Sequence, residues 1–156
     1  MGGVRMADIS EKGDILREAV AFGEIRMRRE TIELIRGGRI EKGDPLYAAE
    51  IAAIMAAKNA SQIIPLCHPI QITHVQLEHR LKEDSLEVRA RVRAESKTGV
   101  EMEALAAVSA FLLTVWDMVK KYEKDEEGQY PFTEIRAIRV ERKRKGEGLE
   151  RDIRGA

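Results

Sequence analysis

The segment that decides the fold is Leu86–Lys120, LEVRARVRAESKTGVEMEALAAVSAFLLTVWDMVK. Apolar and charged side chains alternate over residues 86–95, which predicts a strand with one buried face. The TGVE sequence at 98–101 fits a capping box and predicts a long helix to about Lys121. This helix is apolar nearly all round, so we expect it to be buried on most sides. Because a sheet in one subunit covers only one side, we expect other subunits to cover the rest.

The flanking segments complete a series of alternating strands and helices. We expect further strands at 15–25, 70–81 and 133–142, and helices at 28–36 and 44–58. Asp44 and Pro45 suit the N-cap and the first position of the second helix. The apolar phase slips near Thr73 and His74, where we expect a bulge or bend. The series predicts an α+β fold, a ferredoxin-like βαββαβ antiparallel sheet with helices packed on one face.

Composition limits the classes of partner. The 156 residues predict a single domain over 1–156, with a loose N-terminal arm at 1–12 and a charged, disordered tail at 144–156. Lys plus Arg and Asp plus Glu each number 27, a balance that argues against nucleic acid. The apolar stretch 104–119 is short for a membrane span. The lone Cys67 excludes an intrachain disulfide and suits the cytoplasm.

The long helix carries the main candidates for chemistry. Asp117 and Lys120 are three residues apart and share a face among apolar neighbours. An ordinary ion pair is the simpler interpretation, but a charged pair in such surroundings is costly unless it has a function. Glu103 points in nearly the same direction, about 21 Å away along the axis. If both ends belong to one site, the site spans a subunit interface or the substrate is long.

Other candidates lie before helices and between prolines. Cys67 and His68 lie in an extended segment bracketed by prolines, so they point to opposite faces and form no thiolate–imidazole pair. Glu101 could simply favour the positive end of the helix. Lys42 and Lys97 each precede a helix start, where an ammonium group and free amides suit an anion. Because no Cys or His cluster has zinc spacing, we expect no metal site.

Four stretches of the sequence, taken together, resemble the motifs of a known family. They are KGD at 42–44, IPLCHP at 64–69, KTGVEMEAL at 97–105 and WDMVK at 116–120. They resemble the cyclic pyranopterin monophosphate synthase family, molybdenum cofactor biosynthesis protein C, over about residues 6–143. The resemblance implies a homohexamer, a trimer of dimers, with sites at subunit interfaces. It implies a lyase without a cofactor that converts (8S)-3′,8-cyclo-7,8-dihydroguanosine 5′-triphosphate to cyclic pyranopterin monophosphate and pyrophosphate.

The resemblance also assigns residues. Asp117 matches the catalytic aspartate and Lys120 the essential lysine of the family. The implied substrate-binding residues are Leu66, Cys67, His68, Met102, Glu103, Glu101, Lys42, Arg17 and Lys143. Several cations suit a triphosphate. We expect Lys120, with a depressed pKa, to exchange protons at the base ring while Asp117 orients it.

Two other classes of protein remain open. A ferredoxin-like regulatory module could bind a nucleotide without turning it over, and it would release no pyrophosphate. A purely structural oligomer would gain nothing from polar groups on the long helix.

Overall fold

The computed structural model describes residues 2–154, so Met1, Gly155 and Ala156, the ends of the predicted arm and tail, lie outside the described residues. One antiparallel sheet contains β1 (Ile15–Arg26), β2 (His74–Leu81), β3 (Ser85–Ser96) and β4 (Glu134–Lys145) in the order β2-β3-β1-β4. The helices are α1 (Arg29–Arg36), α2 (Pro45–Lys58), α3 (Ala60–Ile63), α4 (Glu101–Glu123) and α5 (Glu147–Arg154).

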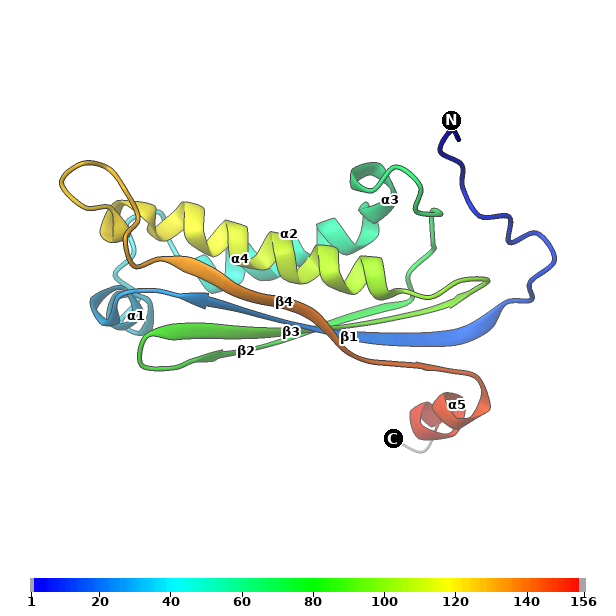
Figure 1. Cartoon of the computed structure of the whole chain (residues 1–156). Helices are drawn as coiled ribbons and strands as arrows, with labels where there is room; N and C mark the ends of the chain where they lie inside the picture. Colours follow the sequence, from blue (N-terminus) through cyan, green and yellow to red (C-terminus); the bar gives the residue numbers. More distant parts are fainter. Residues whose placement is uncertain (1, 155–156) are drawn as a thin grey trace.

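The elements form two layers, with α2 and α4 covering one face of the sheet (Figure 1). Neighbouring strands are antiparallel throughout, and β1 pairs with β3 on one side and β4 on the other. This arrangement confirms the predicted α+β, ferredoxin-like fold. Asp44 caps α2 as expected, since its carboxylate accepts hydrogen bonds from the amides of Leu46 (2.8 Å) and Tyr47 (3.3 Å).

The core lies where α4 crosses the small residues of β1. Ala19 and Ala21 are buried on the helix side of β1, and Gly23 continues their row. A Cβ atom at Gly23 would collide with the side chains of Val108 and Leu112 on α4. The absence of a side chain at Gly23 is therefore what lets the helix approach the sheet so closely.

Helix α4 is long and apolar enough, by length and composition alone, to cross a bilayer. In this fold it is the core helix, because Val108, Phe111 and Val115 are fully buried against the rest of the chain. It is not buried on all sides within this chain, since Leu113 is 60% exposed.

Two local expectations were wrong. The N-cap of α4 is Val100, which makes no side-chain capping bond, so the expected capping box does not form. Strand β2 begins at His74 rather than at residue 70. Thr73 nevertheless donates from its amide to the Arg93 carbonyl (3.0 Å), so the chain approaches β3 just before the strand starts.

The tail predicted to be disordered is structured up to Arg154. Strand β4 extends to Lys145, and α5 follows after Gly146, whose φ of 84° turns the chain. Leu149 is only 2% exposed, which gives this charged helix an apolar anchor. The expectation of disorder rested on the charged composition of the segment, which does not show that one buried leucine can anchor it.

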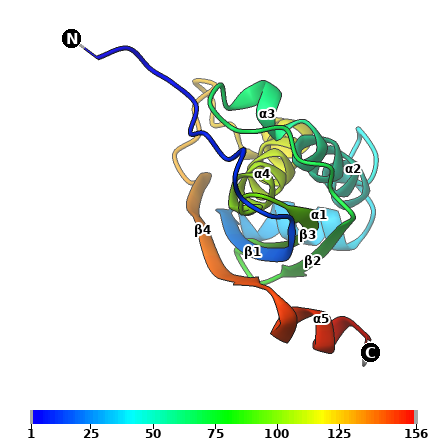
Figure 2. The same ribbon diagram turned by 90° about the vertical axis from the view of Figure 1, so that its right-hand side faces the viewer.

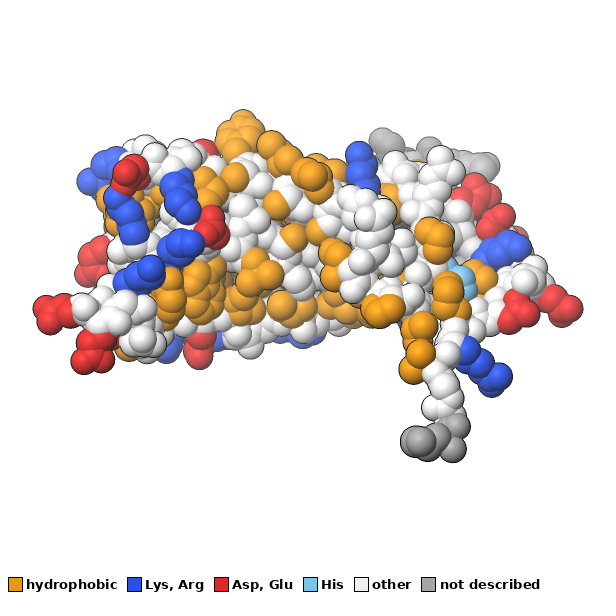
Figure 3. All heavy atoms as spheres, turned by 90° about the horizontal axis from the view of Figure 1, so that it is seen from above, with side chains coloured by type: hydrophobic (Ala, Val, Ile, Leu, Met, Phe, Trp, Pro, Cys, Tyr) orange, Lys and Arg blue, Asp and Glu red, His pale blue; other side chains and the backbone are white. Residues whose placement is uncertain are grey.

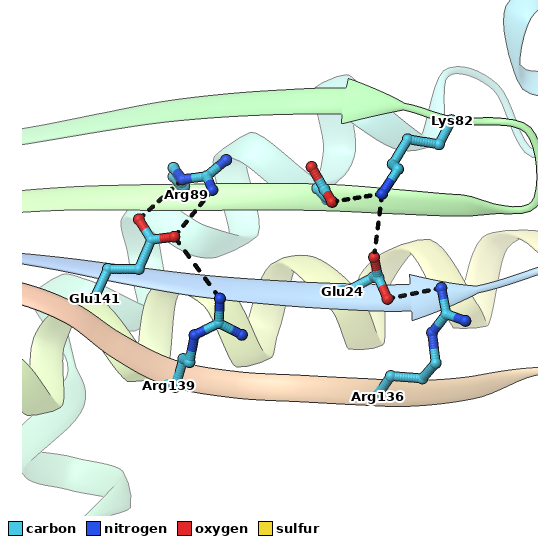
Figure 4. Close-up of polar contacts among 7 residues, drawn as sticks. Glu24, Lys82, Arg89, Arg136, Arg139 and Glu141 are labelled. Carbon is cyan, nitrogen blue, oxygen red and sulfur yellow. Dashed lines mark hydrogen bonds and ion pairs between the residues drawn. The ribbon is translucent and has the colours of Figure 1, made fainter.

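The face of the sheet away from α4 is covered with ion pairs between strands (Figure 4). Glu24 on β1 lies 2.7 Å from Arg136 on β4. Glu141 on β4 accepts two hydrogen bonds of 2.9 Å from Arg89 on β3. An antiparallel sheet with one apolar and one charged face needs only one helical layer.

A buried carboxylate joins three elements at the end of α4. Glu123 is fully buried and accepts hydrogen bonds from the Arg28 amide (3.1 and 3.2 Å) and the Thr133 hydroxyl (2.6 Å). The Thr31 hydroxyl donates to it as well. Glu123 thus ties α4 to the start of α1 and the segment before β4.

We predict that Glu123→Ala lowers the free energy of unfolding by about 3 kcal/mol, because two buried hydroxyl groups and one partly buried amide lose their acceptor. Urea denaturation at fixed protein concentration measures the change. Glu126→Ala, on an exposed residue three positions later, is the control and should stay within about 0.5 kcal/mol of wild type. Equal losses in both variants would contradict the anchoring role.

Candidate functional site

Cys67 and His68 diverge as expected, but the extended segment predicted for them is wrong. Residues 64–67 form a turn closed by a hydrogen bond from the Cys67 amide to the Ile64 carbonyl (3.1 Å), because Pro65 suits the second position of a turn. The Cys67 thiol points to the start of α4, with its Sγ 3.8 Å from Glu103 Oε1. The His68 ring turns to the N-terminal arm, where Nε2 lies 2.8 Å from the Ala7 carbonyl oxygen. The two side chains therefore have different partners and form no catalytic dyad with one another.

Glu103 is a carboxyl group held in apolar surroundings. It is 2% exposed, and its Oε2 has no hydrogen-bond partner among the described residues. Burial raises the pKa of Glu103, although hydrogen bonds from its own amide and from Cys67 oppose this. Burial, and then the charge of Glu103, raises the pKa of the Cys67 thiol. Glu103 is therefore a group suited to carry a proton, and Cys67 is not an activated nucleophile.

A hollow of about 240 Å³ opens beside the start of α4, and we call it the cationic pocket. Its lining residues are Arg17, Glu18, Gly99, Val100, Glu101, Lys143, Arg144 and Lys145. Four of these are cations and two are carboxylates, so the pocket suits an anion. Arg17 is held in place by the carbonyl oxygens of Ser96 (3.1 Å) and Lys97 (3.3 Å).

Glu101 belongs to this pocket rather than to a helix cap. Its Oε1 lies 2.9 Å from Lys143 Nζ, and its side chain folds back over Gly99, which has no Cβ to obstruct it. Burial acts to raise the pKa of Glu101, but the Lys143 hydrogen bond, with the charges of Lys143 and Arg17, outweighs burial and lowers it. An arriving anion would compete with Glu101 for Lys143.

The other end of α4 carries a second group, which we call the Asp117 cluster: Lys42, Asp117 and Lys120. Lys120 Nζ lies 2.7 Å from Asp117 Oδ1, and Lys42 Nζ lies 3.1 Å from Asp117 Oδ2. The hydrogen bond from Lys120 and then that from Lys42 lower the pKa of Asp117. The same bond to Asp117, and then its charge, raises the pKa of Lys120.

The expectation of a depressed Lys120 pKa is therefore wrong for this chain. The side chains of Asp117 and Lys120 are 57% and 42% exposed, so burial cannot outweigh their mutual attraction. Val115 and Val119 face the core, whereas the charged pair lies on the outer side of the helix, where Leu113 is exposed as well.

The chain divides the predicted site residues between the two ends of α4. Cys67, Glu101, Glu103 and Lys143 gather at the first turn, and the Asp117 cluster lies about four turns later, roughly 21 Å away. Leu66 and Met102 are exposed apolar side chains close in sequence to the first group. No group of three or more His, Cys, Asp or Glu side chains within residues 2–154 is placed to hold a metal ion.

Three charged lining residues of the cationic pocket were not among the predicted site residues: Glu18, Arg144 and Lys145. Lys145 pairs with Arg17 across β1 and β4, two residues from Lys143, so both lysines share one face. Strand periodicity would have indicated Lys145 had β4 been expected to extend beyond residue 142.

Comparisons with known proteins agree with these motifs. The model of the MoaC family matches residues 6–146. A protein of Aeropyrum pernix, named a probable cyclic pyranopterin monophosphate synthase, is 56% identical over 94% of this chain and 100% of its own length. One of Pyrococcus furiosus with the same name is 56% identical over 93% of both chains. One of Methanothermobacter thermautotrophicus, named a probable accessory protein of that synthase, is 53% identical over 92% of this chain and 90% of its own.

The chain therefore belongs to the MoaC family, which confirms the family expected from the four sequence stretches.

We predict that Glu103→Gln gains stability relative to wild type as the pH rises. A raised pKa means that neutral Glu103 contributes stability fully below its unfolded value of 4.5, and that this contribution is lost as the pH rises through the folded value. Glutamine has no proton to lose. Thermal midpoints of both proteins between about pH 4 and pH 8 measure the difference. A difference in thermal midpoint that stays constant over this range would contradict a raised pKa for Glu103.

Proposed function

We propose that this protein is a cyclic pyranopterin monophosphate synthase of the cytoplasm, acting in molybdenum cofactor biosynthesis. Its proposed substrate is (8S)-3′,8-cyclo-7,8-dihydroguanosine 5′-triphosphate, and its products are cyclic pyranopterin monophosphate and pyrophosphate. Family membership and the names of the relatives support this. The structural observation that supports it best is the presence of two charged half-sites at opposite ends of one helix.

The two half-sites form one complete site if two subunits pack with their α4 helices antiparallel. A two-fold axis near the middle of α4 would set the Asp117 cluster of one subunit against the cationic pocket of its partner. The helical layer exposes an apolar surface suited to such packing (Figure 3). Its most exposed large side chains include Tyr47, Ile51, Met55 and Leu113. We propose such dimers as the units of a hexamer, a trimer of dimers.

Different residues of the proposed site bind the triphosphate and the base of the substrate. Positive charge for the triphosphate comes from Arg17 and Lys143 of one subunit and from Lys42 of the partner subunit. The base and its fused ring lie against the segment of Leu66, Cys67 and His68 and against Met102 and Glu103 of α4. Those residues combine apolar surface with polar groups that select orientation.

The directions of the pKa shifts support a division of the proposed proton transfers among these groups. Asp117 stays ionised and keeps Lys120 protonated, so Lys120 begins the reaction as an acid rather than as a base. Closing the cyclic phosphate joins a substrate hydroxyl oxygen to the α-phosphorus and breaks the bond from that phosphorus to pyrophosphate. Lys120 gives a proton to the departing pyrophosphate, and the proton lost by the hydroxyl returns Lys120 to its charged form. The pocket cations stabilise the charge that develops on the pyrophosphate. The buried carboxyl of Glu103 can supply a proton where the ring opens.

A ferredoxin-like module that only binds the nucleotide is the alternative. The names of the relatives favour the enzyme, since those of Aeropyrum pernix and Pyrococcus furiosus are called probable synthases. Incubation with the cyclised nucleotide distinguishes the two, since the module would release no pyrophosphate.

We predict that Asp117→Asn and Lys120→Met each lower kcat by roughly 10²–10⁴-fold, the usual contribution of a positioned acid or base. Pyrophosphate release from the cyclised nucleotide measures kcat, and gel filtration confirms that each variant still assembles. Lys121→Met, on the neighbouring exposed lysine, is the control and should retain wild-type turnover. Near-wild-type rates in both test variants would refute the assignment.

A mixing experiment tests the shared site. Asp117→Asn and Lys143→Ala subunits, each defective alone at low substrate, are coexpressed with different tags and purified as mixed oligomers. One site of each mixed dimer then receives both wild-type groups, so we expect about a quarter of wild-type activity with random pairing. Purified oligomers that contain both subunits and show no recovery would exclude a site built from two chains.

A further inference from the structure

Helix α5 lies outside the residues that the family model matches, yet it is attached to a wall of the cationic pocket. The match ends at residue 146, and α5 begins at Glu147. Three lining residues of the pocket, Lys143, Arg144 and Lys145, are the last residues of β4 immediately before it. The helix lies on the face of the sheet away from α2 and α4 (Figure 2), so it can act on the pocket only through the strands that it contacts, β1 and β4.

Three contacts hold α5 and the end of β4 to the domain. The Gly146 amide donates to the Leu16 carbonyl at the start of β1 (3.0 Å). Leu149 is almost completely buried, unlike most of its helix. Arg144 Nη2 donates to Asp152 Oδ2 (2.7 Å), and this carboxylate belongs to α5.

The end of β4 needs such support. Strand β4 lies at an edge of the sheet, so it has a hydrogen-bonded neighbour, β1, on one side only. The last residues of an edge strand open easily unless later residues hold them. If the end of β4 opened, Lys143 and Lys145 would leave the positions beside Glu101 and Arg17 that make the pocket cationic.

Arg144 links the cationic pocket to α5. Its guanidinium lies 4.0 Å from Glu18, a buried carboxylate of the pocket, and 2.7 Å from Asp152. Asp152 therefore fixes a side chain that lines the pocket without touching the pocket itself.

We propose that α5 is a positioning element in which Leu149 and Asp152 hold Lys143, Arg144 and Lys145 in the geometry that binds the phosphates of the substrate. The proposal rests on the proposed function, because that function assigns Lys143 to the triphosphate. A helix that only protected the chain end would affect stability, whereas a positioning helix changes the local order of β4 and the affinity of the pocket.

The test compares Leu149→Ala, Asp152→Asn and a chain ending at Gly146 with wild type. Arg151→Ala, on an exposed α5 residue, is the matched control, and Leu149→Met is the conservative rescue. Hydrogen exchange of amides 142–146 reports order without substrate, and we expect it to be about tenfold faster in the three test variants. We expect KM for the cyclised triphosphate to rise about tenfold with kcat within about twofold. Both controls should behave as wild type.

Each result decides the proposal. Unchanged exchange at 142–146 overturns it whatever the kinetics, and faster exchange with unchanged KM overturns the link to substrate. A fall in kcat and thermal midpoint without a change in KM indicates a structural helix and also overturns it. If wild type itself releases no pyrophosphate, the proposed function fails. Binding of inorganic triphosphate to the same variants then decides positioning, with weaker binding supporting it and equal binding refuting it.

Discussion

The close packing of α4 on β1 is the constraint on which the rest of the structure depends. Gly23 and the buried alanines of β1 leave room for Val108 and Leu112, so the helix lies directly on the sheet. That contact fixes the axis of α4 and, with it, every group that the helix carries. Glu101 reaches the ends of β1 and β4, and Asp117 reaches Lys42 before α2. A side chain at Gly23 would move both ends of the helix together.

The same helix presents carboxyl groups with opposite behaviour. Burial raises the pKa of Glu103 near its start, whereas two lysines lower the pKa of Asp117 near its end. When the pKa values of two carboxyl groups are shifted in opposite directions, one group is suited to carry a proton and the other to remain an anion. The environment of each group, rather than its residue type, sets its function.

The sequence was a good guide where local rules decide structure. Alternation over 86–95 predicted β3, and Asp44 with Pro45 predicted the start of α2. The motifs identified the candidate site residues but not their grouping, because contacts such as Lys143 with Glu101 join distant parts of the chain. Sequence also suggested that apolar neighbours surround Asp117, although Val115 and Val119 face the core and Asp117 lies on the outer side of the helix. The order of α5 depends on Leu149, one apolar residue in a charged segment whose average composition is typical of disorder.

An uninterrupted helix between two half-sites also limits how its length can change. Each residue inserted into α4 would turn the far end by about 100° and advance it by about 1.5 Å. Inserting one residue would therefore aim Asp117 and Lys120 in a different direction from the one they have now. The original direction returns only after about seven residues, when the far end has moved by roughly 10 Å. The length of α4 therefore fixes the relative direction of the two half-sites, and neither a small insertion nor a small deletion would preserve it.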